Sequence, residues 1–114
     1  MIVRRCTPAD ADRLARIRDE AFRARKGDGS EPVERRGSPD GVAGWIAREE
    51  PEVFVAESEG TVVGWGLIYT TENPLAAVFV DPTAPEEAVR ERLLDRLERV
   101  AEAAGVPSLH VYTY

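Results

Sequence analysis

The sequence predicts an α/β (α+β) domain in which a mixed central sheet of about five strands is flanked by helices. Apolar residues alternate in several short segments and recur at helical spacing in others. These segments follow one another in the order β-α-α-β-β-β-α-β. The strand, long helix and strand at the C-terminal end are typical of a crossover unit, which places two parallel strands side by side. At 114 residues, the chain is expected to form a single domain, residues 1–114.

The first strand and helix are predicted at the N-terminus. Residues Ile2 to Cys6 have the composition of a short strand. Thr7 then provides a helix N-cap, Pro8 suits the first helical position, and Asp10 adds an acid at the third. Apolar residues continue at helical spacing to about Ala24 (Leu14, Ile17, Ala21, Phe22). We therefore expect an amphipathic helix here.

A polar segment follows the first helix. Residues 25–40 are rich in Gly, Pro and charged residues, which predicts a mobile loop of about sixteen residues, either functional or disordered. Ser38 and Pro39 are expected to open a second, short helix that Pro51 ends. Its apolar residues share one side (Val42, Trp45, Ile46).

A β-hairpin is predicted next. Residues Glu52 to Glu57 and Thr61 to Thr70 are rich in β-branched and aromatic residues, and Ser58-Glu59-Gly60 joins them. Gly64 and Gly66 interrupt the second strand, and glycine inside a strand is typical of a bulge or of a close backbone approach.

The C-terminal part contains the crossover unit. Leu75 to Val80 is almost entirely apolar and is expected to be a central strand. Thr83 is expected to cap the long third helix by the same logic as Thr7, and Gly105 with Pro107 ends it. Its predicted buried stripe is apolar (Val89, Leu93, Leu97, Val100, Ala104). Leu109 to Tyr114 is the last predicted strand.

Composition excludes several classes of protein. The net charge of −6 argues against nucleic-acid binding, which needs a basic surface. An acidic surface either attracts cationic partners such as amines or basic peptides, or simply keeps the protein soluble. No apolar run approaches the roughly 20 residues of a membrane span, and no signal peptide or metal-ligand spacing is found. Cys6, the single cysteine, has no internal disulfide partner, so we expect a cytoplasmic protein.

Several motifs, taken in order, resemble those of the GNAT acetyltransferases. The resemblance covers nearly the whole chain (Val3 to Asp10, Phe54 to Glu57 with Val62 to Gly64, Phe79 to Pro82, Leu93-Leu94, Ala101 to Gly105). It implies a GNAT-like three-layer fold that lacks the family's last helix and last two strands. It also implies N-acyl transfer from acetyl-CoA to an amine or a protein acceptor. In that family the cofactor contacts the end of the fourth strand and the start of the next helix, which here are Phe79, Val80, Ala88, Val89 and Arg90.

The pyrophosphate loop departs from the family pattern. The family loop reads Arg/Gln-x-x-Gly-x-Gly/Ala, and its defining positions fall on Pro85, Ala88 and Arg90. The adjacent Glu86 and Glu87 repel a diphosphate. Arg90 could either reach the phosphates from the side or pair with Glu86 along the helix. We therefore expect acetyl-CoA binding to be weakened or lost.

Catalytic groups are sparse. The residues that could transfer a proton are Glu72, at the entry to the fourth predicted strand, and His110 and Tyr112 on the last strand, where Tyr114 lies on the same face. Glu72 is equally explained as a turn residue, and His110 and Tyr112 as residues of an exposed strand edge. No metal site is expected.

Two functional hypotheses remain open. The first is a GNAT-family acetyltransferase-like protein with an altered cofactor loop, whose activity the missing elements place in doubt. The alternative is a non-catalytic interaction or regulatory module that kept the scaffold. Because exposed strand edges pair with other chains, we expect a homodimer or a partner complex through residues 109–114.

Overall fold

The computed structural model describes residues 1–25, 51–71 and 74–113. Its elements are β1 (Ile2–Arg5), a 3-10 turn η1 (Pro8–Asp10), α1 (Ala11–Arg25), β2 (Glu52–Ser58), β3 (Thr61–Tyr69), β4 (Leu75–Val80), α3 (Glu86–Ala103) and β5 (His110–Thr113). This order confirms the predicted one. The predicted loop after residue 25, the second short helix and Glu72 lie outside the described residues.

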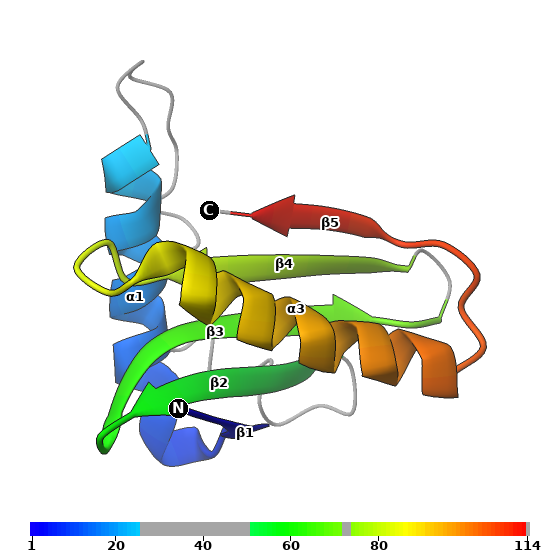
Figure 1. Ribbon diagram of the computed structural model, residues 1–114, viewed down its shortest axis with the longest axis horizontal. Helices are drawn as coiled ribbons and strands as arrows, with labels where there is room; N and C mark the ends of the chain where they lie inside the picture. Colours follow the sequence, from blue (N-terminus) through cyan, green and yellow to red (C-terminus); the bar gives the residue numbers. More distant parts are fainter. Residues whose placement is uncertain (26–50, 72–73, 114) are drawn as a thin grey trace.

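The strands form one five-stranded sheet in the order β1-β2-β3-β4-β5 (Figure 1). The first four strands pair antiparallel, whereas β4 and β5 pair parallel, because α3 carries the chain back between them. The sheet is therefore mixed, as predicted. Within the described part of the chain, β1 and β5 are its two edges.

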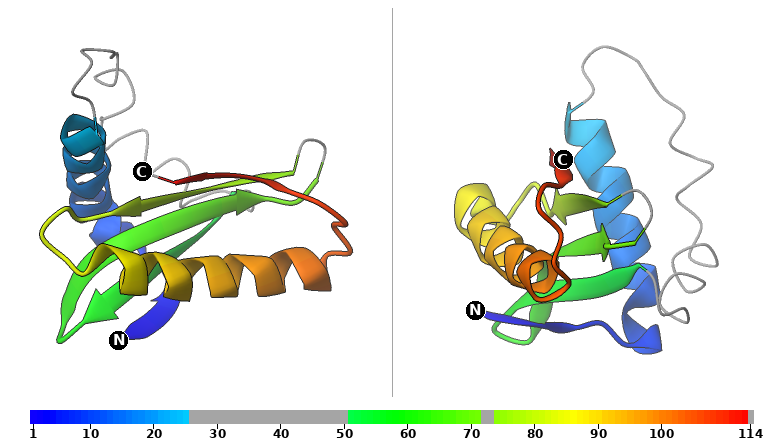
Figure 2. Two further views of the ribbon diagram at one scale, coloured as in Figure 1. Left: turned by 45° about the horizontal axis from the view of Figure 1, so that its top comes forward. Right: turned by 90° about the vertical axis from the view of Figure 1, so that its right-hand side faces the viewer.

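The two helices cover opposite faces of the sheet (Figure 2, right). Strand side chains alternate between faces, so the three central strands β2, β3 and β4 supply both cores. The core on the α1 face contains Leu14, Ile17, Val53, Val55, Trp65, Leu67 and Phe79, among others. The core on the α3 face contains Phe54, Ala56, Ile68, Val78, Val80, Val89, Leu93 and Leu97, among others. The predicted layering of helix, sheet and helix is confirmed.

Two details of α3 differ from the prediction. The N-cap residue is Pro85, because the hydroxyl of Thr83 donates to the carboxylate of Asp81 at 2.9 Å instead of capping the helix. The buried stripe ends at Ala101, whereas Ala104 is exposed, because a repeat of four residues follows the face that packs on the sheet.

The C-terminal end of α3 is confirmed. Gly105 has a φ of +77°, a left-handed conformation that glycine adopts without steric cost. Its N–H donates to the carbonyl of Glu102 at 3.0 Å, and the N–H of Val106 donates to that of Ala101 at 3.0 Å. These two bonds form a Schellman cap.

Gly64 lets α3 approach the sheet closely. A Cβ added at Gly64 would lie 2.7 Å from Cγ1 of Val89 and 3.1 Å from the carbonyl oxygen of Phe79. The register of β2 and β3 also shifts between Ala56 and Glu57. Both features that the strand glycines predict, a bulge and a close approach, are therefore present.

A polar network fixes the entry to α1. The Asp10 carboxylate accepts from the Thr7 N–H at 2.8 Å, and the Arg4 guanidinium reaches both Asp10 at 3.0 Å and Glu57 at 2.9 Å. Burial alone would raise the pKa of Asp10, but the bonds from Arg4 and Thr7 outweigh it and hold this pKa below its usual value. The predicted helix start at Thr7 is confirmed.

Candidate functional site

The end of β4 lies close to the start of α3. Pairing of β4 with β3 continues to Val80, which lies opposite Gly64. Pairing with β5 reaches only Val78, opposite Thr113, within the residues that the structure describes. Val80 therefore ends β4 beyond the last described pair with β5.

The first turn of α3 offers backbone donors next to this edge. Its first helical bond runs from the N–H of Val89 to the carbonyl of Pro85 at 3.1 Å. The N–H groups of residues 86–88 precede that bond, and no side chain at Pro85 caps them. Such N–H groups, together with the helix dipole, favour an anion.

The side chains of this turn combine both signs of charge. Glu86 and Glu87 are exposed, and Glu86 Oε2 accepts from Arg90 Nη2 at 2.8 Å. Of the two alternatives for Arg90, the structure contains the helix pair. The Arg90 Nε is nevertheless buried without a hydrogen-bond partner among the described residues.

The ring of Phe79, one of the predicted site residues, lies in the hydrophobic core. Phe79 stacks on Trp65 with ring centroids 4.8 Å apart and meets Phe22 edge-on at 5.8 Å. Trp65 is fully buried, and its Nε1 donates to the carbonyl of Leu14 at 2.9 Å. Val89 is also fully buried. The side chains of Phe79 and Val89 are therefore not available to a ligand.

An ion pair anchors the turn between β4 and α3. Asp81 is 7% exposed and accepts from Arg13 Nη2 at 2.8 Å and from the N–H and hydroxyl of Thr83, each at 2.9 Å. Burial alone would raise the pKa of Asp81, but the bonds from Thr83 and Arg13 outweigh it and lower this pKa. Asp81 is therefore ionised at neutral pH.

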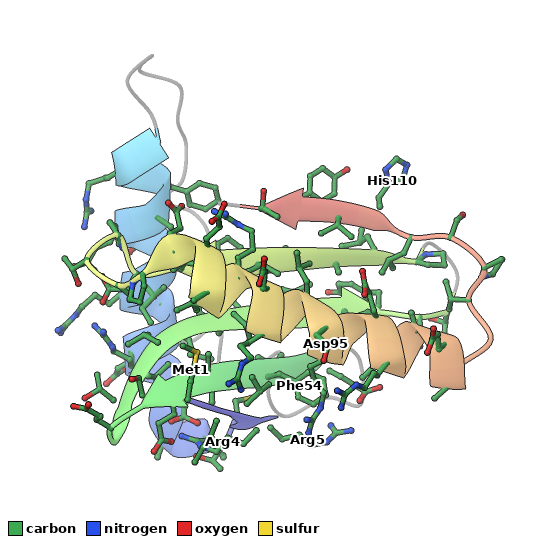
Figure 3. The ribbon with its side chains drawn as sticks, viewed as in Figure 1. Met1, Arg4, Arg5, Phe54, Asp95 and His110 are labelled. Atoms are coloured by element: carbon green, nitrogen blue, oxygen red, sulfur yellow. The ribbon has the colours of Figure 1, made fainter. Side chains whose placement is uncertain are left out.

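The structure brings some predicted site residues together and separates others. Phe79, Val80 and the residues 88–90 meet at the junction of β4 and α3. His110 pairs with Leu75 at the opposite end of β4, about 16 Å from Val80 at roughly 3.3 Å per residue. Figure 3 shows His110 pointing away from α3.

His110 lies beside an open hollow at that far end. The hollow has a volume of about 450 Å³ and is lined by Pro74, Leu75, Ser108, Leu109, His110 and Tyr112. The His110 and Tyr112 rings are stacked with centroids 6.4 Å apart. This end of the sheet is therefore distinct from the junction of β4 and α3.

Other chemistry finds little support among the described residues. Burial raises the pKa of the Cys6 thiol to about 11, so Cys6 is protonated at neutral pH. Within residues 1–25, 51–71 and 74–113, no three His, Cys, Asp or Glu side chains gather as a metal site would require. The helices described in this structure include none with the length and apolarity to span a bilayer.

The residues that the sequence analysis missed are Arg13, Asp81 and Thr83. Arg13 and Asp81 are 68 positions apart in the chain, and nothing in either local pattern links them. A carboxylate directly after a buried strand, before Pro82, is the one local signal.

The chain matches a family model over most of its length. Residues 11–114 match the model described as "Acetyltransferase (GNAT) family". An "IAA acetyltransferase" from Azospirillum brasilense is 40% identical over 72 residues, which are 60% of this chain and 47% of that protein. The match thus spans about half the length of this curated relative.

Solved acetyltransferases share the fold. The N-acetyltransferase from Staphylococcus aureus Mu50 has a TM-score of 0.75 at 21% identity, over 96% of this chain and 71% of that one. The PaiA N-acetyltransferase from Thermoplasma acidophilum, solved with coenzyme A, has a TM-score of 0.85 at 12% identity, over 96% and 77%. The ribosomal-protein-alanine N-acetyltransferase from Brucella melitensis has a TM-score of 0.71 at 24% identity, over 97% and 73%.

Proposed function

Because this chain belongs to the acetyltransferase (GNAT) family, we propose that it binds acetyl-CoA at the junction of β4 and α3 and transfers the acetyl group to an amine. One observation carries this proposal. β4 ends at Val80, opposite Gly64, and after the turn of residues 81–85 the chain enters a helix whose start has no side-chain cap. A related fold was solved with coenzyme A.

The two ends of this site suit different parts of the ligand. The pantetheine arm would bond to the backbone at Val80, where β4 ends, as an added strand does at a sheet edge. The diphosphate would lie against the N–H groups of residues 86–88, close to the Arg90 guanidinium that pairs with Glu86. Acetyl-CoA supplies an activated thioester, and the amine displaces its thiol. A net charge of −6 favours a cationic acceptor.

The residues fit the diphosphate less well than the pantetheine arm. Glu86 and Glu87 bring two carboxylates to the helix turn that would receive the phosphates. Arg90 neutralises one of them through its ion pair. We therefore propose a weakened acetyl-CoA site rather than a lost one.

The double variant Glu86→Gln/Glu87→Gln tests this charge argument. Removing both carboxylates and freeing Arg90 is expected to tighten acetyl-CoA binding about tenfold, since two partly screened charges are worth roughly 1 kcal/mol or slightly more. Calorimetric titration measures the dissociation constant. The gain should shrink at high salt because exposed charges are screened.

A matched control is Glu98→Gln/Glu102→Gln. Both glutamates are exposed on α3, and they lie about 18 to 22 Å further along the helix at 1.5 Å per residue. This control changes net charge equally and should leave affinity unchanged. Equal gains in both double variants would show a net-charge effect, and no binding by the wild type at millimolar ligand would refute the proposal.

The residues that we propose for proton transfer are still Glu72, His110 and Tyr112. Since His110 lies about 16 Å from Val80 along the sheet, a role for it requires an acceptor that lies along β5. We also propose a cytoplasmic location, where acetyl-CoA is available, and we propose neither nucleic-acid nor membrane binding.

A second candidate function is a non-catalytic module that pairs through β5. Two large apolar side chains are exposed on this edge strand, Val111 at 43% and Tyr112 at 49%. An edge strand with exposed apolar side chains is a template for another strand. We propose that a second copy of this chain occupies it.

Val111→Lys/Tyr112→Lys tests the pairing. Two opposed edges would each gain two charges, so the variant should sediment as a monomer at concentrations where the wild type is a dimer. Ile2→Lys is the matched control, since Ile2 is 61% exposed on β1, the other edge. It should leave the dimer intact. A wild-type monomer at about 100 μM would overturn the pairing and leave the acetyl-CoA proposal untouched.

A further inference from the structure

We propose that Arg13 is a positioning residue that holds the turn between β4 and α3 in place for the diphosphate. This inference rests on the proposed function. Arg13 belongs to α1, and its guanidinium reaches the turn from the opposite face of the sheet to α3. Its hydrogen bonds within the described residues go to Val62 and Asp81 and not to the first turn of α3, so it would act on a ligand through Asp81.

Arg13 bridges two strands with two different nitrogen atoms. Its Nε donates to the carbonyl of Val62 in β3 at 3.0 Å, while its Nη2 donates to Asp81 Oδ2 at 2.8 Å. One planar group thereby ties the start of β3 to the residue directly after β4. A lysine could make one of these bonds, but not both in this geometry.

Asp81 passes this restraint on to the turn. Its other carboxylate oxygen, Oδ1, accepts from both the N–H and the hydroxyl of Thr83. Its backbone N–H donates to Val63 at 2.9 Å, and its carbonyl accepts from Ala84 at 2.9 Å. The N–H groups of Asp81, Thr83 and Ala84 are therefore all hydrogen-bonded, and those of Thr83 and Ala84 are bonded to Asp81 itself.

The same contacts keep the start of α3 open. Thr83 uses its hydroxyl on Asp81, and Pro85 at the N-cap has no side-chain acceptor. The N–H groups of residues 86–88 are thus left for an anion. In this chain the ion-paired carboxylate of Asp81 therefore fixes the turn, which lacks the glycines of the family's pyrophosphate loop.

Loss of Arg13 should affect the turn more than the rest of the fold. Asp81 is almost buried, and a buried carboxylate that loses its cation partner is costly. The turn can relieve this cost by moving Asp81 towards water, which displaces residues 82–85. The Arg13 side chain is itself 31% exposed, so its replacement leaves no large cavity.

Two ligands distinguish positioning from general stability. Arg13→Gln is expected to weaken acetyl-CoA binding about tenfold by calorimetry and to change binding of S-acetylpantetheine, which lacks the diphosphate, less than twofold. Arg13→Lys should weaken acetyl-CoA about threefold. Arg16→Gln, an exposed arginine one turn along α1, should change neither. An equal loss of both ligands in Arg13→Gln would overturn the proposal.

A second measurement needs no ligand. In Arg13→Gln the amides of Thr83 and Ala84 should exchange with solvent at least tenfold faster, while those of the β2–β3 hairpin keep their rates. Asp81→Asn should give the same pattern and serves if Arg13→Gln does not fold. If the wild type binds no acetyl-CoA, the proposed function fails alone, and unchanged exchange in both variants would overturn the role of Arg13.

Discussion

Trp65→Ala is expected to lower the free energy of unfolding by about 4 kcal/mol, the largest effect of any substitution considered for this chain. Trp65 is fully buried between α1 and the sheet. Its loss removes the stack on Phe79 and the bond from Nε1 to the carbonyl of Leu14. Since small domains are stable by only about 5 to 15 kcal/mol, the variant should be marginally folded.

Urea denaturation followed by far-ultraviolet circular dichroism measures this change. The control Trp65→Phe keeps an aromatic ring beside Phe79 and removes only part of the volume and the hydrogen bond. It should cost about 1 to 2 kcal/mol. A Trp65→Ala protein within 1 kcal/mol of the wild type would show that this core relaxes to fill the space.

Gly64→Ala should be the second most destabilising change, at about 3 kcal/mol. The new methyl group would lie 2.7 Å from Cγ1 of Val89 and 3.1 Å from the carbonyl oxygen of Phe79. Val89 is fully buried and cannot swing aside, and the carbonyl belongs to the backbone of β4. The start of α3 must therefore move away from the strand end, and acetyl-CoA binding should weaken with it.

Gly66→Ala grades this prediction. There the new methyl would lie 3.1 Å from both the Ala77 carbonyl oxygen and Cδ1 of Leu97, contacts that a shift of a few tenths of an ångström relieves. We expect about 1 kcal/mol of destabilisation at Gly66, which pairs with Val78 in the middle of β4. Equal losses of stability in the two variants would contradict the special closeness of α3 at Gly64.

Local patterns predicted the elements well where local physics determines them. The start at Thr7 and Asp10 is confirmed because a capping box is complete within four residues. The end at Gly105 is confirmed because a left-handed residue closes the helix locally. The Thr83 cap was wrong for the opposite reason: a partner distant in sequence, Arg13, sets the conformation of Asp81, and Asp81 binds the hydroxyl that would otherwise cap the helix.

The candidate site shows the same division. Motif order located Phe79, Val80 and the start of α3, and chain direction alone brings a strand end next to the helix that follows it. No local pattern could say that His110 lies opposite Leu75, at the other end of β4, because strand register depends on contacts between distant segments. The family resemblance indicated the proposed cofactor residues, and strand register separates these residues from His110.

The sequence by itself determined the mixed sheet, its flanking helices and the membership of the GNAT family. Alternation, helical spacing, caps and short motifs each depend on residues that lie close together in the sequence. Only the tertiary structure decided that α3 seats against Gly64, that Arg13 restrains Asp81, and that Arg90 pairs with Glu86 while its Nε stays without a described partner. These depend on distances between side chains from different elements, which packing of both sheet faces sets.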